Sequence, residues 1–365
     1  MIRHSDHFHG SDLETIEDLY HIKKEDIISF SANVNPLGLS SKLRTSLADR
    51  LDVITSYPDR EYKALRKTIG AYCHTDFENI VVGNGSTELI SLFIQFLHPK
   101  KALILGPTYS EYEREVSLEG GTTLYVPLSE AHDFQCDPDE LSQHLNESID
   151  LLIICNPNNP TSTAISQKDM RKILDHCKQH DIFVMVDETY VEFAPDVEAI
   201  TSIPLTSYYN NLIILRGISK FFASPGLRLG YAVTGNHALL QSIEGRKNPW
   251  TINSLAEVAG QLMFTDVEYI KRTRELISTE RTRICHRLSG LPHIKFYTPV
   301  ANFVLIHLLD DKVNADLVFG KAIQKGLMIR NCSTFPFLDN QYIRFCFMMP
   351  EDNDRLLDVL EEVLQ

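Results

Sequence analysis

The sequence predicts an α/β fold in which a mostly parallel sheet is covered by helices on both faces. Short apolar runs recur along the chain, at 80–83, 102–106, 123–128, 151–156, 182–187, 212–215 and 229–233. Most are uninterrupted by polar residues, as is typical of strands buried on both sides. Segments with helical periodicity, such as 86–97 and 166–180, lie between most of them. No obvious full helix joins the last two runs, so we expect the final strand to be antiparallel.

The composition is that of a globular protein of a reducing compartment. The chain has 365 residues, of which 43% are hydrophobic and 23% charged. Its formal net charge of −14 argues against nucleic acid or an anionic membrane as a partner. The seven cysteines show no CxxC pair and no Cys/His metal spacing, so we expect no metal and a cytoplasmic location. There is no secretory signal at 1–14 and no apolar run near the ~20 residues of a membrane span.

We expect three parts along the chain. Residues 1–45 form an N-terminal arm that joins the small domain, 46–265 form the large domain, and 266–365 form the small C-terminal domain. Within the last part, 296–308 and 341–348 read as antiparallel strands. The helical stretch 253–264 is predicted to bridge the two domains.

Lys220 is the most informative residue of the chain. It lies in the run GISKFFASPGLRLGY at 217–231, directly after a predicted buried strand. Burial lowers the pKa of an amine, and a lysine that can shed its proton can form a Schiff base with an aldehyde. Ser219 and Arg228 nearby suit a phosphate. Pyridoxal phosphate carries both an aldehyde and a phosphate; the alternative is a surface lysine beside a structural arginine.

Four polar motifs stand where predicted strands end, the edge at which such sheets bind ligands. GNGSTE at 83–88 joins a strand to a helix N-terminus, which can bind an anion. Tyr109 could stack on a flat ring, and Asn159, in NPNNPT, could donate to a phenolate oxygen. Asp187 opens the motif DETY and needs a positive partner if buried, such as a protonated pyridine nitrogen, while Tyr190 closes it. Each motif also has a purely structural explanation, as a turn, a sheet cover or a helix cap.

Together these motifs resemble the fold-type-I pyridoxal-phosphate enzymes of the class I and II aminotransferase family, over essentially the whole chain. The segment SKxxxxPGLRLG, with its Lys-to-Arg spacing, carries the resemblance. It implies a seven-stranded, mostly parallel sheet, a smaller α+β domain, and a homodimer with shared active sites. It assigns catalysis to Lys220, Asp187 and Tyr190. Cofactor binding is implied for Gly85, Ser86, Thr87, Tyr109, Asn159, Asp187, Tyr190, Ser219, Lys220, Arg228 and, from the neighbouring subunit, Tyr57.

Two positions depart from the family pattern. Gly217 stands where many relatives carry a hydroxyl, three residues before the lysine, so one phosphate contact is missing. Ser162 replaces the glycine that usually follows Asn-Pro-Thr.

The resemblance also suggests the substrate. Arg344 matches the arginine that binds an α-carboxylate, and Arg330 matches one that binds a substrate phosphate in histidinol-phosphate aminotransferases. His9, and the phrases FSANVNPLG at 30–38 and NPWTIN at 248–253, are similar to the threonine-phosphate decarboxylases of corrinoid biosynthesis. By that resemblance His9 and Asn33 are substrate-binding residues.

The implied reaction is decarboxylation of O-phospho-L-threonine to 1-aminopropan-2-ol phosphate and carbon dioxide, with O-phosphoserine as a variant substrate. The first alternative is a histidinol-phosphate aminotransferase that uses 2-oxoglutarate. A second alternative, a non-catalytic pyridoxal-phosphate module of a regulator, is disfavoured by the presence of Lys220. Residue types alone do not decide between decarboxylation and transamination, because the cofactor draws electrons from Cα in both.

Overall fold

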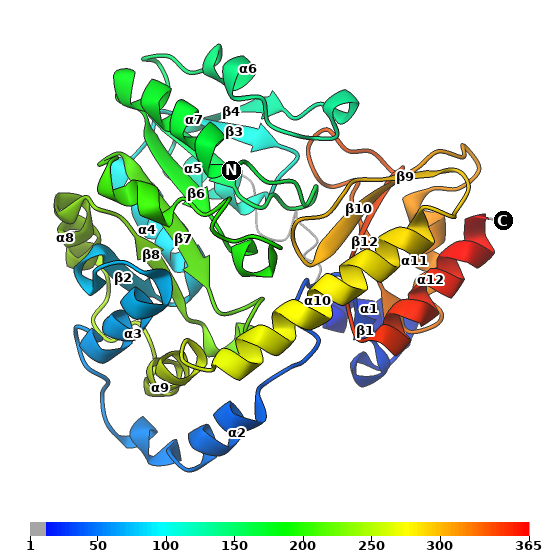
Figure 1. The fold of residues 1–365 in the computed structure, drawn as a ribbon, viewed down its shortest axis with the longest axis horizontal. Coiled ribbons are helices and arrows are strands. Elements are labelled where there is room, and N and C mark those ends of the chain that lie inside the picture. The colour runs from blue at the N-terminus through cyan, green and yellow to red at the C-terminus, as the bar shows by residue number, and fades with distance from the viewer. Residues whose placement is uncertain (1–11, 365) are drawn as a thin grey trace.

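A seven-stranded sheet forms the centre of the larger half of the molecule (Figure 1). The computed structural model describes residues 12–364. The strands are β2 (Ile80–Gly83), β3 (Lys101–Gly106), β4 (Thr122–Pro127), β5 (Leu151–Cys155), β6 (Phe183–Asp187), β7 (Leu212–Gly217) and β8 (Gly230–Val233). Their order is β2-β8-β7-β6-β5-β3-β4. Only β8 runs against its neighbours, which confirms the predicted mostly parallel sheet with an antiparallel final strand.

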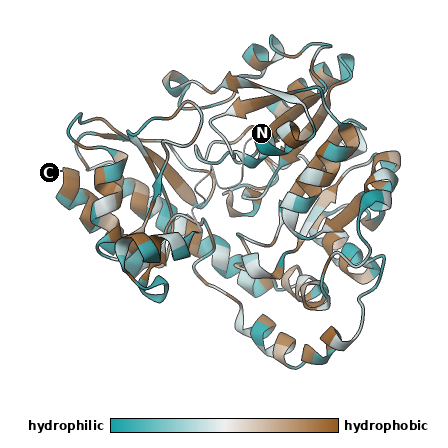
Figure 2. Ribbon diagram, turned by 180° about the vertical axis from the view of Figure 1, so that it is seen from behind, coloured by the Kyte–Doolittle hydropathy of each residue, from teal (hydrophilic) through white to brown (hydrophobic). Residues whose placement is uncertain are grey.

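Helices cover both faces of this sheet because its strands are apolar on both sides. On one face lie α4 (Gly85–Leu97), α5 (Glu111–Leu118) and α8 (His237–Arg246); on the other lie α3 (Lys63–Cys73), α6 (Pro138–Ser142) and α7 (Gln167–Gln179). Alternate residues of one strand serve the two layers: Ile104 packs with the first set, and Leu103 and Leu105 with the second. Figure 2 shows the hydrophobic colour concentrated on the strands and on the helix faces turned toward them.

A second sheet of four antiparallel strands lies beside the first. It has the order β12-β13-β10-β9, with β9 (Ile294–Phe296), β10 (Phe303–Leu308), β12 (Arg330–Asn331) and β13 (Tyr342–Cys346). This confirms the antiparallel strands expected in the C-terminal part. Helices α11 (Ala315–Ile323) and α12 (Pro350–Leu364) accompany it (Figure 1).

The N-terminal segment reaches this second half of the molecule. After α1 (Leu13–Tyr20), β1 (Ile28–Ser29) pairs in parallel with β11 (Leu327–Met328). The chain then crosses to α2 (Ser41–Ala48), which lies against α9 at the lower edge of the view in Figure 1. The division into arm, large domain and small domain, with its boundaries, stays a prediction.

The long helix α10 (Val267–Leu288) runs between the two halves (Figure 1). Its Arg281 donates to the carbonyl of Phe193 on one side (2.6 Å) and of Ala301 on the other (3.1 Å). The stretch predicted as a bridge does form a helix, α9 (Ser254–Met263), but it packs against α2 and α3. The bridging role predicted for 253–264 was therefore wrong, and α10 has it. Within residues 12–364, no helix combines the length and the apolar character that crossing a bilayer requires.

Candidate active site

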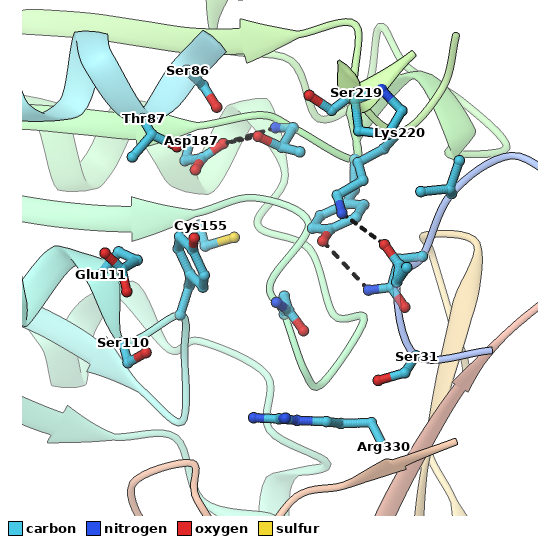
Figure 3. Close-up of a pocket in the computed structure, with 18 of the residues that line it drawn as sticks. Ser31, Ser86, Thr87, Ser110, Glu111, Cys155, Asp187, Ser219, Lys220 and Arg330 are labelled. Carbon is cyan, nitrogen blue, oxygen red and sulfur yellow. Dashed lines mark hydrogen bonds between the residues drawn. The ribbon is translucent and has the colours of Figure 1, made fainter. Parts of the chain in front are cut away.

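A cavity of about 500 Å³ lies between the carboxyl ends of the large sheet's strands and the second sheet (Figure 3). It brings together most of the residues predicted for the site: Asn33, Ser86, Thr87, Tyr109, Asn159, Asp187, Tyr190, Ser219, Lys220, Arg228, Arg330 and Arg344. Gly85 lies at its edge, against the Arg228 guanidinium. Tyr57 is outside the cavity, and His9 lies outside the described residues.

Lys220 follows β7 by three residues and points its amine into the cavity (Figure 3). Its Nζ donates to the carbonyl of Ala32 at 2.6 Å. Burial, assisted by the positive charge of Arg344, lowers the pKa of Lys220 to about 8. The alternative of an ordinary surface lysine does not fit this placement.

One end of the cavity is shaped for an anion. Ser86, in the first turn of α4, and Ser219 lie at this end (Figure 3), where helix N–H groups are free to bind negative charge. Gly85 has a positive φ of 80°, and a Cβ there would run into the Arg228 guanidinium. A Cβ at Gly230 on β8 would collide with the backbone of Gly85 and Ser86. The turn therefore depends on glycine at both positions.

Both departures from the family pattern have a structural context. A Cβ on Gly217 would meet only ordinary contacts, the nearest being the Leu229 carbonyl (3.5 Å) and Ser86 Oγ (3.8 Å), so the position has room for the missing hydroxyl. Ser162 has a positive φ of 60°, which explains why glycine is usual there. Its Oγ accepts from the backbone N–H of Ala301 at 2.9 Å, and this bond ties the loop to the second sheet.

Asp187 ends β6 and is 4% exposed. Its Oδ2 accepts from the Tyr112 hydroxyl at 2.7 Å, and its Oδ1 accepts from the Thr189 backbone N–H at 2.9 Å and hydroxyl at 2.5 Å. Burial raises the pKa of Asp187, while these hydrogen bonds oppose the rise. Asp187 thus also closes the turn that follows it through Thr189, but the helical turn Val191–Phe193 begins after Tyr190, so the alternative of a helix N-cap is wrong.

Three further side chains surround the space next to Asp187. Tyr190 lies 3.4 Å from Asn33 Nδ2, and burial raises its pKa to about 12. Asn159 accepts a hydrogen bond from Arg344 through its Oδ1, which leaves its NH₂ group to donate. Tyr109 packs edge-to-face on Tyr112 with ring centroids 5.5 Å apart, and burial raises its pKa as well.

Arg330 and Arg344 line the opposite end of the cavity, on β12 and β13, where they are direct cross-strand partners. They are only 8% and 4% exposed. Arg344 donates to the Ser31 carbonyl at 2.6 Å, and Arg330 to the Thr334 hydroxyl at 2.9 Å. Burial and the charge of Arg344 lower the pKa of Arg330 to about 10. Two neighbouring buried guanidiniums repel each other, and negative charge near them, such as that of Asp12 beside Arg330, offsets the repulsion.

The segment 31–33 holds three of these groups at once. The carbonyls of Ser31 and Ala32 accept from Arg344 and Lys220, and the Asn33 amide faces Tyr190. Asn33 has a positive φ of 56°, and its buried Oδ1 has no hydrogen-bond partner within residues 12–364. This oxygen is therefore an acceptor left for a ligand.

Sequence reasoning missed Tyr112, Thr189 and the Ala32 carbonyl. The first two had a weak signal, because Tyr112 stands three residues after Tyr109, and Thr189 stands two residues after Asp187, the spacing of an Asx turn. The carbonyl of Ala32 had none, since any residue supplies one.

Tyr57 is 80% exposed and rests on Trp250, with ring centroids 4.7 Å apart. It contributes nothing to the cavity of its own chain. Its role at a neighbouring subunit's phosphate stays a prediction.

The fit of the site to pyridoxal phosphate follows from these contacts. An amine of lowered pKa, a glycine-lined anion cradle and a buried carboxylate without a cationic partner in the described chain surround one cavity. These groups fit the aldehyde, the phosphate and the ring nitrogen of pyridoxal phosphate, one group for each.

Comparison with known proteins gives the same class. The family model for class I and II aminotransferases matches residues 25–360. A protein of Caldanaerobacter subterraneus, whose name gives threonine-phosphate decarboxylase as a provisional assignment, is 36% identical over 90% of this chain and 88% of its own. The threonine-phosphate decarboxylase of Salmonella typhimurium is 31% identical over 98% and 96%.

A solved structure extends the comparison. The histidinol-phosphate aminotransferase of Clostridium acetobutylicum superimposes with a TM-score of 0.86 and 30% identity, covering 92% of this chain and 98% of that one. The chain belongs to the class I and II aminotransferase family, whose enzymes depend on pyridoxal phosphate.

Proposed function

We propose that the protein is a pyridoxal-phosphate-dependent lyase that converts O-phospho-L-threonine to 1-aminopropan-2-ol phosphate and carbon dioxide, a step that serves cobalamin biosynthesis. The observation that carries the proposal is the cross-strand pair Arg330 and Arg344 at the end of the cavity away from Ser86. O-Phosphoserine, which differs by one methyl group, is the expected second substrate.

The arginine pair suits a short substrate with two anionic groups. Cross-strand neighbours place their Cβ atoms about 5 Å apart, and phosphothreonine carries its carboxylate and phosphate only a few bonds apart. Both guanidiniums are buried, so anions that pair with them offset the cost of their desolvation. We assign the carboxylate to Arg344 and the phosphate to Arg330, with His9 and the free Oδ1 of Asn33 as further substrate contacts.

The opposite end of the cavity and its floor are assigned to the cofactor. Gly85, Ser86, Thr87, Ser219 and Arg228 would hold the cofactor phosphate, together with Tyr57 of the partner subunit. Tyr109 would stack on the ring, Asn159 and Tyr190 would contact its 3′ oxygen, and Asp187 would pair with its nitrogen.

When bound, the cofactor supplies an electron sink for the bond that breaks at Cα. Lys220 has an amine that can take up or deliver a proton near neutral pH, because its pKa is about 8. Arg344 and Arg330 orient the substrate by binding its carboxylate and its phosphate, respectively. Their placement therefore decides which Cα bond is presented for cleavage.

Transamination of histidinol phosphate is the second candidate, favoured by the superposition on the Clostridium acetobutylicum enzyme. Histidinol phosphate has no carboxylate, whereas phosphothreonine carries both a phosphate and the α-carboxylate that we assign to Arg344. For that reason we prefer the decarboxylase.

A direct comparison of the two activities tests the proposal. The holoenzyme is incubated with phosphothreonine or phosphoserine, and carbon dioxide is followed. In parallel it receives histidinol phosphate with 2-oxoglutarate, and glutamate is followed. We expect carbon dioxide from phosphothreonine and no glutamate; glutamate without carbon dioxide would overturn the proposal.

We propose in addition that the enzyme is a cytoplasmic homodimer with shared active sites, acting on a small phosphorylated amino acid. The exposure of Tyr57 supports the dimer, since a residue meant for a neighbouring site must project from its own chain.

A further inference from the structure

We propose that Tyr112 and Thr189 are positioning residues that keep the Asp187 carboxylate ionised and thereby keep the facing cofactor nitrogen protonated. The inference rests on the proposed function only in that a pyridoxal-type ring must face Asp187. It assigns to two side chains outside the predicted site the control of the cofactor's electron-withdrawing power.

The geometry gives Asp187 three donors and no cation. The Tyr112 hydroxyl lies 2.7 Å from Oδ2, and the Thr189 hydroxyl and N–H lie 2.5 and 2.9 Å from Oδ1. Within residues 12–364, no lysine or arginine forms an ion pair with this carboxylate. Hydrogen bonds to the charged form of a buried acid are what keep it charged.

The two hydroxyls come from different elements and act on different oxygens. Tyr112 lies in the first turn of α5, where its ring also packs against Tyr109. Thr189 lies in the turn after β6 and lines the cavity. Removing one hydroxyl therefore leaves the other in place, and the two effects can be measured separately.

The other titratable groups around Asp187 do not change charge in the range of interest. Cys155, its neighbour on β5, has a pKa raised by burial to about 12. Burial also raises the pKa of Tyr190 to about 12 and that of Tyr109 further. Lys220, with a pKa of about 8, is the exception, and it is taken up in the covalent link to the cofactor.

The proton balance predicts the direction of the effect. Asp187 and the ring nitrogen share one proton, which stays on nitrogen while the carboxylate is the weaker base. Without the Tyr112 or Thr189 hydroxyl the carboxylate becomes more basic, and the proton shifts toward it. With the cofactor bound, the nitrogen of Lys220 would then keep its proton to higher pH.

The test is a pH titration of the cofactor's absorbance in the native holoenzyme and in four purified variants. Tyr112→Phe and Thr189→Val remove one hydroxyl each and keep the shape of the side chain. Tyr231→Phe and Thr206→Val are controls that remove buried hydroxyls elsewhere. The Tyr231 hydroxyl accepts a hydrogen bond from the Cys73 thiol, and the Thr206 hydroxyl donates one to the Ile203 carbonyl. We expect the pH midpoint of the absorbance change to rise by about half a unit or more in Tyr112→Phe and Thr189→Val. It should not move in the two controls, Tyr231→Phe and Thr206→Val.

A conservative variant and steady-state kinetics test the same two residues further. Thr189→Ser restores a hydroxyl and should return the midpoint to that of the native enzyme. The site variants should lose kcat for phosphothreonine while KM stays within about twofold, since substrate contacts are untouched. Midpoints of Tyr112→Phe and Thr189→Val equal to those of the controls would overturn the inference.

The two proposals fail separately. If the native protein forms no cofactor absorbance, or makes no carbon dioxide, the proposed function is wrong. If it does both while the site variants titrate like the controls, only the role of Tyr112 and Thr189 is wrong.

Discussion

The Lys220 amine combines a short hydrogen bond to a backbone carbonyl with a pKa well below that of an ordinary lysine. Its reactivity toward an aldehyde depends on the neutral form, so the local burial of one side chain controls how the cofactor is acquired.

We therefore predict that cofactor-free protein takes up pyridoxal phosphate faster as pH rises, with a midpoint at about 8. Below this pH the amine is protonated and cannot attack; above it the rate levels off. Stopped-flow absorbance after mixing, from pH 6 to 10, measures the profile. A midpoint near that of an exposed lysine, about 10.4, would show that the cavity does not desolvate the amine.

Arg330 should act on phosphorylated substrates alone. We predict that Arg330→Ala raises KM for phosphothreonine by about tenfold or more, because a charge-assisted contact contributes about 1.5–3 kcal/mol. L-Threonine, which lacks the phosphate, serves as the internal control and should be processed as poorly as before. Equal losses on both substrates would make Arg330 structural.

Glu192 is buried to 1% exposure, and neither carboxylate oxygen has a hydrogen-bond partner in the described chain. Burial raises its pKa to about 7, although Arg216 and Arg274 oppose the rise. The folded protein thus holds this proton more tightly than the unfolded one, so stability falls as pH rises from about 4.5 to about 7.

Glu192→Gln cannot lose that proton. We predict nearly equal stability of variant and native protein at pH 4, and a variant more stable by about 3 kcal/mol at pH 8. Urea unfolding of both proteins at the two pH values gives the difference between their free energies of unfolding. Contributions from other titrating groups are the same in both proteins and cancel in this difference. A variant that is no more stable at pH 8 would mean that Glu192 is charged and paired.

Sequence patterns identified Lys220 and Asp187 because strand ends and polar motifs are visible in one dimension. The Ala32 carbonyl that binds Lys220 lies 188 residues away in sequence. A contact of this kind follows from how the segment after β1 passes Lys220, where Asn35 also donates to the Lys220 carbonyl, and no local pattern contains that.

At the scale of elements, the candidate anion site around Gly85, Ser86 and Ser219 depends on how closely β8 approaches the start of α4. Gly230 on β8 faces the backbone of Gly85 and Ser86 without room for a side chain.

We predict that Gly230→Ala weakens pyridoxal phosphate binding about tenfold or more, because a forced shift in packed structure costs about 1–3 kcal/mol. Gly226→Ala, in the same loop region but with open space around it, is the matched control. Equilibrium titration of cofactor-free protein measures both. Unchanged affinity in Gly230→Ala would show that the helix start is free to move.

Strand and helix positions were predictable because apolar runs and helical periods are local signals. The seven strands of the large sheet were each found within a few residues. The bridging helix was assigned to the wrong element, since α9 and α10 are both amphipathic and their docking partners do not follow from that pattern.

For the whole molecule, the exposed apolar side chains near Tyr57 point to association. Leu51, Ile54 and Trp250 are 53%, 64% and 42% exposed in the same region as Tyr57. A second copy that covers this surface would also bring Tyr57 to its partner's site.

Mixing inactive variants tests that arrangement. Lys220→Ala and Tyr57→Ala are each impaired alone, but a hybrid dimer has one site with both native residues. We predict that co-refolding equal amounts restores activity toward about a quarter of the native value, since half of randomly formed dimers are hybrids with one intact site. Activity no higher than the mean of the two parents would contradict shared sites.

The proposed function requires that Lys220 carries pyridoxal phosphate. Borohydride reduction of the purified holoenzyme, followed by peptide mass spectrometry, shows which lysine is modified. We expect a phosphopyridoxyl group on Lys220 alone. Label on Lys247, the other lysine whose pKa burial lowers, or no label at all, would contradict it.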